Sequence, residues 1–333
     1  MIAAELRGPD GFPTGFATER RRREYGFDGR PLLSKGGQFE NLLRKPFRPG
    51  ISGTSSKWPK RSHPARGSVV AFLTIPGHRA NTMILEFSMV PKFSISGAAL
   101  LAGNVDVWLL TVPGWPVDVG LDLLDPQERA HWARFRFDED RRLYAAAHAL
   151  LRITLSHYTV IDPRDWRFGA GPYGRPELTG ALAALGLRFN LSHTRGLAAC
   201  AVTRNHTIGI DVELLRNSID FLAIAQTHFT DCECAQIAAA PAALKADVFF
   251  SVWTLKEAYL KARGFGLSLP LKSFSVNVVP PSIRPAPDDC AFWYASLAPQ
   301  EGCYLVAVAA PLLDHDKMPN IVYRKCDDSW FRC

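Results

Sequence analysis

The chain has 333 residues, of which 47% are hydrophobic, so it can bury a sizeable core in one or two domains and is not disordered throughout. Its net charge of +7 is unevenly distributed, because residues 1–82 carry 15 Lys and Arg against 6 Asp and Glu, an excess of +9, whereas the remainder is slightly acidic. The seven cysteines form no Cys-x-x-Cys pair, which fits free thiols in a reducing compartment better than disulfides or a zinc framework. The most apolar window, residues 98–112, is interrupted by polar residues and too short for a bilayer. We therefore expect a soluble, cytoplasmic protein with no membrane partner.

Residues 1–82 show no sustained periodicity and combine glycine and proline with the run Arg20–Arg23. Such a segment buries little, so we predict a basic, mostly disordered extension that reaches to residue 103. A solvated charge run without a dedicated partner is the favoured interpretation of the arginines, and a nucleic-acid-binding arm is the alternative. Translation that starts near Met83 or Met89 is a further possibility.

The first predicted strand covers Val105–Leu110, where hydrophobic residues predominate. The sequence Asp125-Pro126-Gln127-Glu128 has the spacing of a capping box and predicts a helix start. A longer amphipathic helix follows residue 138, with leucine and alanine at core spacing up to Leu155. The basic side chains on these helices include Arg134, Arg141 and Arg142. Taken alone, they indicate a solvated helix face.

Two polar motifs lie at predicted turns and strand ends. The loop Gly171–Pro176, which contains Arg175, is by itself a Gly/Pro turn. Ser192 and His193 end a predicted strand, where a capping serine beside an exposed histidine is the simplest interpretation. No nucleophile-elbow glycine pattern surrounds Ser192, so no Ser-His-Asp triad is predicted.

The segment Thr207–Glu213 alternates strictly, so its apolar side chains lie on one face of a strand and Asp211 and Glu213 on the other. Solvent-facing acidic residues on a strand are common. The alternative is a pair of carboxylates that point into a site.

A predicted helix ends near Gly264 and carries Glu257 and Lys261 four residues apart, hence on one face. A surface ion pair would explain that spacing. If this helix packs on the acidic strand, however, the three carboxylates of Asp211, Glu213 and Glu257 converge. Such a set of hard oxygen ligands suits Mg²⁺ better than zinc.

The combination of Gly-Ile-Asp-Val-Glu with the later Trp-Thr-Leu-Lys-Glu-Ala-Tyr-Leu-Lys resembles the two signature motifs of the 4′-phosphopantetheinyl transferases of the surfactin type. The segments around Arg134 and His148–Arg152 resemble the N-terminal signature of this family. The loop with Arg175 resembles its Gly-Lys-Pro loop, and Asn190–His193 resembles its Asn-(Leu/Ile)-Ser-His motif. The resemblance runs from residue 105 to about residue 310.

The resemblance implies an α+β fold, a pseudo-twofold pair of similar α/β subdomains with the active site in the cleft between them, preceded by the disordered N-terminal extension. The corresponding domain boundaries are a basic extension at 1–103, subdomains at 104–205 and 206–312, and a tail at 313–333.

The resemblance also implies the activity of a holo-[acyl-carrier-protein] synthase, which transfers the 4′-phosphopantetheine arm of coenzyme A to a serine of an apo acyl or peptidyl carrier protein and releases 3′,5′-ADP. In this interpretation Asp211, Glu213 and Glu257 bind Mg²⁺, and Lys261 neutralises or protonates the leaving phosphate. Glu257 or a metal-bound water is the base. The partners are coenzyme A and a carrier, and we expect a monomer. Carriers of fatty-acid, polyketide, nonribosomal-peptide or aminoadipate (lysine) pathways all fit.

The residues that the resemblance assigns to coenzyme A are Arg134, Arg141, Arg142, Arg175, Ser192 and His193. The chain departs from the family at Glu128 and Leu143, where the family commonly has basic residues, so neighbouring basic side chains would have to supply those contacts. Two alternatives from other classes are a non-catalytic carrier-binding module and nucleic-acid binding through the N-terminal arm.

Overall fold

The computed structural model describes residues 69–74, 81–85, 88–89, 100, 103–112, 114–171, 175–215, 220–264, 269–278, 281–284, 290–297, 304–311, 320–326 and 331. The arginine run at 20–23, and with it the alternative of a nucleic-acid-binding arm, lies outside these residues. Within the described ranges, no helix is both long enough and apolar enough to cross a membrane.

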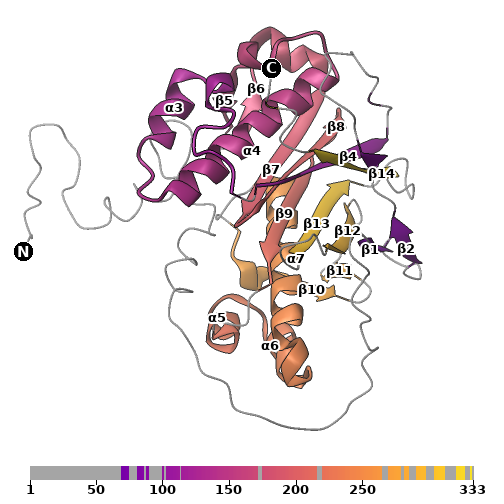
Figure 1. Cartoon of the computed structure of the whole chain (residues 1–333). Helices are drawn as coiled ribbons and strands as arrows, with labels where there is room; N and C mark the ends of the chain where they lie inside the picture. The colour runs from indigo at the N-terminus through magenta and orange to yellow at the C-terminus, as the bar shows by residue number, and fades with distance from the viewer. Residues whose placement is uncertain are drawn as a thin grey trace, which may run out of the picture.

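Two five-stranded sheets dominate the described part of the chain (Figure 1). One sheet has the order β2 (Asn81–Leu85), β1 (Val69–Thr74), β12 (Cys290–Leu297), β13 (Tyr304–Pro311), β9 (Gly209–Leu214). The other has the order β3 (Ser88–Met89), β14 (Asn320–Cys326), β4 (Asn104–Thr111), β8 (Leu197–Arg204), β7 (Leu187–Thr194). Strand β14 pairs parallel with β3 and β4, and the other pairs in these two sheets are antiparallel.

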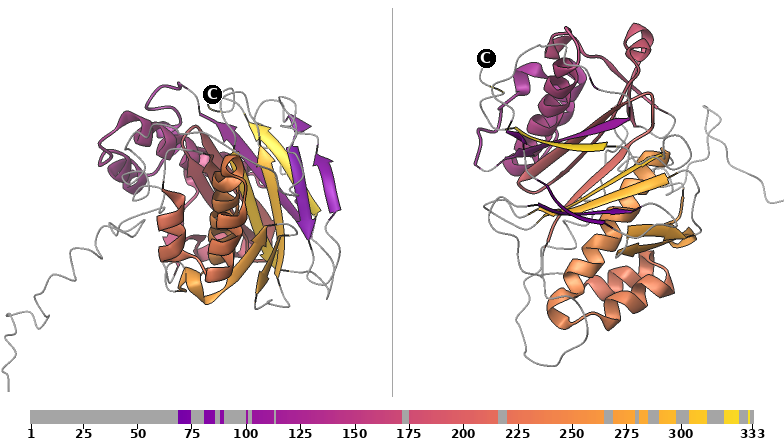
Figure 2. Two further views of the ribbon diagram at one scale, coloured as in Figure 1. Left: turned by 90° about the horizontal axis from the view of Figure 1, so that it is seen from below. Right: turned by 90° about the vertical axis from the view of Figure 1, so that its right-hand side faces the viewer.

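One long helix covers the outer face of each sheet, and the two sheets share an apolar layer between them (Figure 2). The long helices are α4 (Asp138–His157) and α7 (Lys245–Arg263). The remaining described elements are helices α3 (Pro126–Trp132), α5 (Phe221–His228) and α6 (Asp231–Ala239), the ribbons β5 (Phe168–Ala170) with β6 (Pro176–Leu178) and β10 (Ser275–Val278) with β11 (Pro281–Arg284), and 3₁₀ turns at Leu121–Leu123, Pro163–Asp165, Gly180–Leu185, Ala242–Leu244 and Leu271–Ser273.

The central strands are apolar on both faces because each face meets a different core. On β13, Leu305 and Ala307 pack in the core under α7, whereas Val306 and Val308 pack in the layer between the sheets. On β8, Ala198, Cys200 and Val202 lie on one face of the strand and pack in the core under α4. Two sheets, each with one long helix, confirm the predicted α+β fold.

The helix boundaries follow the predicted capping signals. The side chain of Asp125 accepts the N–H groups of Gln127 and Glu128, and the Glu128 carboxylate accepts the N–H of Asp125, which completes the capping box at the start of α3. Gly264 ends α7 with a φ of 70°, in the left-handed region that favours glycine. These local predictions are confirmed.

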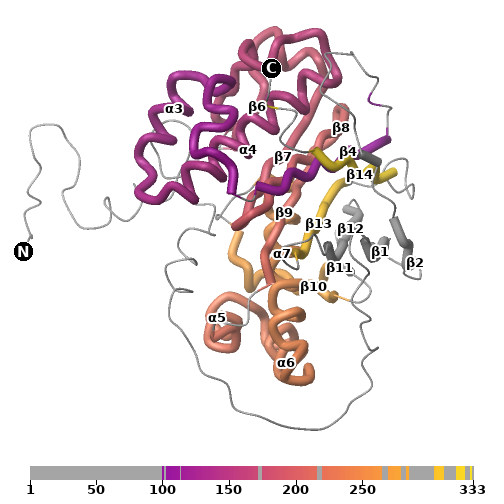
Figure 3. Tube along the Cα trace, in the orientation of Figure 1, coloured from indigo at the N-terminus to yellow at the C-terminus, as the bar shows by residue number. Residues whose placement is uncertain are grey.

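The predicted bounds of the two subdomains need correction at both ends of the chain. Strands β1, β2 and β3 fall within the predicted disordered extension, yet β1 lies between β2 and β12, and β3 pairs with β14. The predicted tail contains β14, which lies beside β4 (Figure 3). The pairings of β1 with β12, of β3 with β14 and of β4 with β14 join segments more than 200 residues apart, so local periodicity could not reveal them. A translation start near Met83 or Met89 would remove β1.

Candidate active site

Side chains connect the two sheets where their edge strands β7 and β9 approach each other. The N–H of Ile210 donates to Asn190 Oδ1 at 2.8 Å, and the N–H of Val212 donates to Ser192 Oγ at 3.3 Å. Alternate side chains of β7 thus accept alternate backbone N–H groups of β9. Asn190 lies two positions before Ser192 in the same motif, but nothing in the sequence pattern indicates that it accepts a hydrogen bond from β9.

Helix α7 packs unusually closely on β9 at Gly209. A Cβ at this position would collide with the carbonyl oxygen of Ala258 and the amide nitrogen of Ala262, and would lie 3.0 Å from Ala262 Cα. Gly209 and Asp211 lie on the same face of β9 because side chains alternate along a strand. The glycine therefore lets the helix that carries Lys261 reach the acidic face of the strand.

Asp211, Ser192 and Lys261 form a triangle of hydrogen bonds at this junction. Lys261 Nζ donates to Asp211 Oδ1 at 2.7 Å and to Ser192 Oγ at 3.0 Å, and Ser192 Oγ donates to the same carboxylate oxygen at 2.9 Å. Asp211 is 5% exposed, and the Lys261 side chain is 26% exposed. The structure thus brings three predicted site residues from three elements into direct contact.

The second carboxylate oxygen of Asp211, Oδ2, is buried and accepts no hydrogen bond. Burial raises the pKa of Asp211 above its usual value, although the charge and hydrogen bond of Lys261 and the hydrogen bond of Ser192 act in the opposite direction. A buried carboxylate oxygen without a donor is a suitable ligand for a hard cation. The chemistry of Asp211 therefore fits Mg²⁺.

Glu213 lies two residues beyond Asp211 on the same face of β9, and Glu257 lies one turn before Lys261 on α7; both are half-buried. Among the residues that the structure describes, no group of three or more His, Cys, Asp or Glu side chains is close enough to hold a metal ion. The predicted elements therefore pack together, but the expected three-carboxylate cluster is not preformed.

His193 follows Ser192 on β7 and is half-buried. Burial, with smaller contributions from the positive charges of His148 and Lys261, lowers the pKa of His193 to about 4. The imidazole is therefore neutral at physiological pH. His148 belongs to α4 and to the segment that resembles the N-terminal signature of the family, so this helix also faces the site.

Glu128, the first departure from the family pattern, has a structural role. Its carboxylate bonds His148 Nδ1 at 2.9 Å and accepts two hydrogen bonds from the fully buried guanidinium of Arg152. Burial alone would raise the pKa of Glu128, but the hydrogen bond and charge of His148 and the charge of Arg152 outweigh it and lower that pKa. An acidic residue here neutralises the buried Arg152.

Arg175 donates to three backbone carbonyls rather than pointing into open solvent. Its Nη1 lies 2.9 Å from Lys261 O, and its Nη2 lies 2.8 Å from Phe189 O and 3.1 Å from Ile208 O. The side chain thus joins β7, α7 and the residue before β9.

The other predicted phosphate contacts lie on or near α4, apart from the triangle. Arg134 is exposed, Arg141 pairs with Asp138 at 3.0 Å, and Arg142 donates to the carbonyl of Trp115. The hydrogen-bond triangle includes none of these three arginines.

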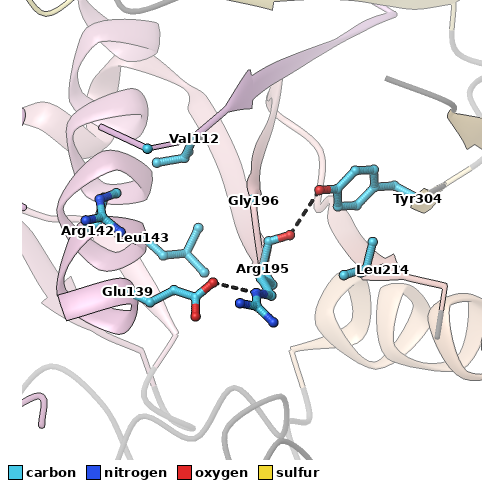
Figure 4. A pocket seen from close by; sticks show the side chains of 9 residues that line it. Val112, Glu139, Arg142, Leu143, Arg195, Gly196, Leu214 and Tyr304 are labelled. Carbon is cyan, nitrogen blue, oxygen red and sulfur yellow. Dashed lines mark hydrogen bonds and ion pairs between the residues drawn. The ribbon is translucent and has the colours of Figure 1, made fainter. Parts of the chain in front are cut away.

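A cavity of about 400 Å³ lies at the boundary of the two halves (Figure 4). Its lining residues come from α4, β13 and the ends of β4, β7 and β9: Val112, Gly114, Glu139, Arg142, Leu143, Arg195, Gly196, Leu214 and Tyr304. Glu139 pairs with Arg195 at 2.6 Å across it, and Tyr304 Oη donates to Arg195 O at 3.1 Å. Its lining residue Leu214 directly follows Glu213 in β9.

Comparison with known proteins matches both halves to the same superfamily. Residues 115–205 match the family model "4′-phosphopantetheinyl transferase, N-terminal", and residues 207–307 match the model of the 4′-phosphopantetheinyl transferase superfamily. The chain is 33% identical over 230 residues to the 4′-phosphopantetheinyl transferase HetI of Nostoc sp., which covers 68% of this chain and 95% of that protein. It is 32% identical over 158 residues to the 4′-phosphopantetheinyl transferase Sfp of Bacillus subtilis, which covers 47% of this chain and 68% of that protein. A phosphopantetheinyl transferase of Thraustochytrium sp. is 27% identical over 243 residues, 66% of this chain and 84% of that protein.

The chain belongs to the 4′-phosphopantetheinyl transferase superfamily. Its similarity to HetI and Sfp confirms the predicted resemblance to the surfactin type and supports an enzyme of this transferase class.

Proposed function

We propose that this protein transfers the 4′-phosphopantetheine arm of coenzyme A to a serine of an apo acyl or peptidyl carrier protein, in a Mg²⁺-dependent reaction. The serine Oγ forms a bond to the β-phosphorus. The bond between that phosphorus and the oxygen bridging to the α-phosphate breaks. 3′,5′-ADP leaves with the electron pair, and the serine proton passes to a base.

The observation that carries this proposal is the Asp211–Ser192–Lys261 triangle at the junction of the two halves. It combines a buried carboxylate, whose Oδ2 accepts no hydrogen bond, with an ammonium 2.7 Å from the other carboxylate oxygen. Transfer from a diphosphate needs both positive charge near the phosphates and an acceptor for the serine proton. The junction supplies both kinds of group.

Asp211, Glu213 and Glu257 are the residues that we propose hold Mg²⁺. A bound Mg²⁺ neutralises negative charge on the diphosphate oxygens. Lys261 stabilises the negative charge that develops on the leaving phosphate, since its ammonium lies at the junction and remains partly exposed. Glu257, half-buried on α7 and one turn from Lys261, accepts the proton of the attacking serine.

His193 and the basic side chains near α4 are proposed to bind coenzyme A. A neutral imidazole can still donate one hydrogen bond to a phosphate oxygen. Arg142 lines the cavity between the halves, which has room for part of the substrate, while Arg134 and Arg141 add positive charge on and near α4. Ser192 contributes by holding Asp211 and Lys261 in place.

The proposed macromolecular partner is a small acidic carrier protein or carrier domain with a reactive serine, and the enzyme acts as a monomer. Carriers of fatty-acid, polyketide, nonribosomal-peptide and aminoadipate pathways remain candidates. In the N-terminal segment, the charge excess of residues 1–82 supports electrostatic attraction to such a carrier.

Release of 3′,5′-ADP tests the reaction. The protein is incubated with coenzyme A, Mg²⁺ and an apo carrier, and the nucleotide is quantified by chromatography. We expect one equivalent of 3′,5′-ADP per carrier, no release with a carrier whose serine is replaced by alanine, and loss of release in EDTA that returns with added Mg²⁺. Equal release with the alanine carrier would contradict transfer to serine.

A further inference from the structure

The Arg175 side chain contacts the backbone at three points, and each point is close in sequence to one member of the Asp211–Ser192–Lys261 triangle. One accepting carbonyl belongs to Lys261 itself. The second, Phe189 O, lies three residues before Ser192, and the third, Ile208 O, lies three residues before Asp211. A single guanidinium therefore fixes the backbone beside all three side chains.

The position of the first contact is important because it is at the end of α7. Lys261 O is one of the last carbonyls of the helix, where no further turn supplies an N–H at the regular spacing. It accepts the Gly264 N–H at 3.3 Å and the shorter bond from Arg175 Nη1 at 2.9 Å. A cation at a helix C-terminus is also favoured by the helix dipole. Arg175 thus anchors the turn from which Lys261 extends to Asp211.

The contacts require the shape of arginine. The planar guanidinium places Nη1 on a carbonyl of α7 and Nη2 on two carbonyls next to β7 and β9, from one rigid group. A lysine ammonium carries its three donors on one atom and cannot occupy both nitrogen positions. The guanidinium links the two halves at this point.

We propose that Arg175 is a positioning residue, which acts on transfer through Lys261 and the triangle rather than through contact with the nucleotide. This inference rests on the proposed function, and it replaces the expectation that Arg175 binds a phosphate of coenzyme A.

The test compares Arg175→Lys with Arg204→Lys. Arg204 is a matched control because it is half-buried and donates to a single carbonyl, Leu185 O at 2.8 Å, away from the triangle. We expect Arg175→Lys to lower kcat by at least about tenfold, with KM for coenzyme A within about twofold of wild type, because displaced catalytic groups reduce turnover more than binding. Arg204→Lys should retain the wild-type kcat and KM.

A double-mutant cycle shows whether Arg175 acts through Lys261. In a Lys261→Met background, followed by mass spectrometry with enzyme in excess over carrier, Arg175→Lys should change the residual rate by less than about twofold. An equal penalty in both backgrounds would overturn the proposal. So would a raised KM for coenzyme A with kcat unchanged, which is the result expected of a nucleotide contact.

Two controls keep this result separate from misfolding and from failure of the proposed function. Urea unfolding of each variant identifies the conditions under which it is fully folded, and the kinetics are measured there. Amide hydrogen exchange of Gly264 provides a local readout: it should accelerate in Arg175→Lys and not in Arg204→Lys, and unchanged exchange would contradict the anchoring role. If neither wild type nor Arg204→Lys transfers the arm, the proposed function fails, whereas a fully active Arg175→Lys overturns only the positioning role.

Discussion

The close contact at Gly209 predicts that Gly209→Ala will damage both stability and turnover. The added methyl carbon would meet Ala258 O and Ala262 N, which are backbone atoms of α7 that no side-chain rotation can move away. The added carbon would lie 2.0 Å from Ala258 O, whereas ordinary contacts begin near 3.4 Å, so the helix has to retreat from β9 by roughly 1.4 Å. Overpacking of this kind costs about 3 kcal/mol of unfolding free energy.

The same retreat would separate Lys261 from Asp211, whose contact is now 2.7 Å. A displacement of about 1 Å at a catalytic group can reduce turnover by about 100-fold. We therefore expect a lower unfolding free energy in urea and, under conditions where the variant is folded, a lower kcat for transfer to an apo carrier.

Gly180→Ala is the control for this experiment. Gly180 has a φ of 58° but nothing within 4 Å of an added Cβ, so alanine there should cost only backbone strain of about 1 kcal/mol and leave kcat unchanged. A Gly209→Ala protein with wild-type stability and kcat would refute the argument that the close approach of α7 positions the site.

Three further predictions concern the metal site, the histidine and the N-terminal strands. Asp211→Ala and Glu257→Gln should each lower turnover by at least about 100-fold at fixed Mg²⁺, and wild-type rates in either would rule out this site. The pKa of His193 in the folded protein, about 4, lies below its usual 6.5, so the folded state favours the neutral imidazole, and the stability that this preference contributes is lost as pH falls from about 6.5 towards 4. Between pH 7 and pH 5, the unfolding free energy measured in urea should therefore decline less in His193→Gln than in wild type. Equal declines in the two proteins would contradict the lowered pKa. A chain that begins at Ser68 should retain the stability and transfer rate of the full chain, apart from weaker carrier association at low salt. A chain that begins at Met83 lacks β1 and should be less stable than the chain that begins at Ser68. Equal stability of these two truncated chains would show that β1 does not stabilise the fold.

Local signals in the sequence were sufficient for the elements around the site. The alternation of residues 207–213 predicted both the buried apolar face of β9 and the opposite face that carries Asp211. The capping box at Asp125 and the glycine after α7 predicted helix ends for the same local reason. Each of these signals depends on neighbouring residues only.

Features that depend on distant segments were not predictable in this way. Nothing in the local pattern indicates that β1 pairs with β12 or that β14 pairs with β3 and β4, since these partners lie more than 200 residues away. Arg175 illustrates the same limit at the site, because its motif suggested a phosphate ligand while its three acceptors come from separate elements. Glu128 departs from the family pattern, and its role also depends on a distant residue, the fully buried Arg152, whose guanidinium bonds Glu128 and, at 3.2 Å, Asp125.

Intact-mass spectrometry of the carrier measures the covalent transfer itself. An apo carrier incubated with coenzyme A, Mg²⁺ and this protein should gain the mass of one 4′-phosphopantetheine, located on its serine by peptide fragmentation. The same incubation with Asp211→Ala should leave the carrier in its apo form over the time in which wild type completes the reaction. A panel of apo carriers that stays unmodified by the folded wild-type protein, or an Asp211→Ala protein that modifies its carrier at the wild-type rate, would contradict the account.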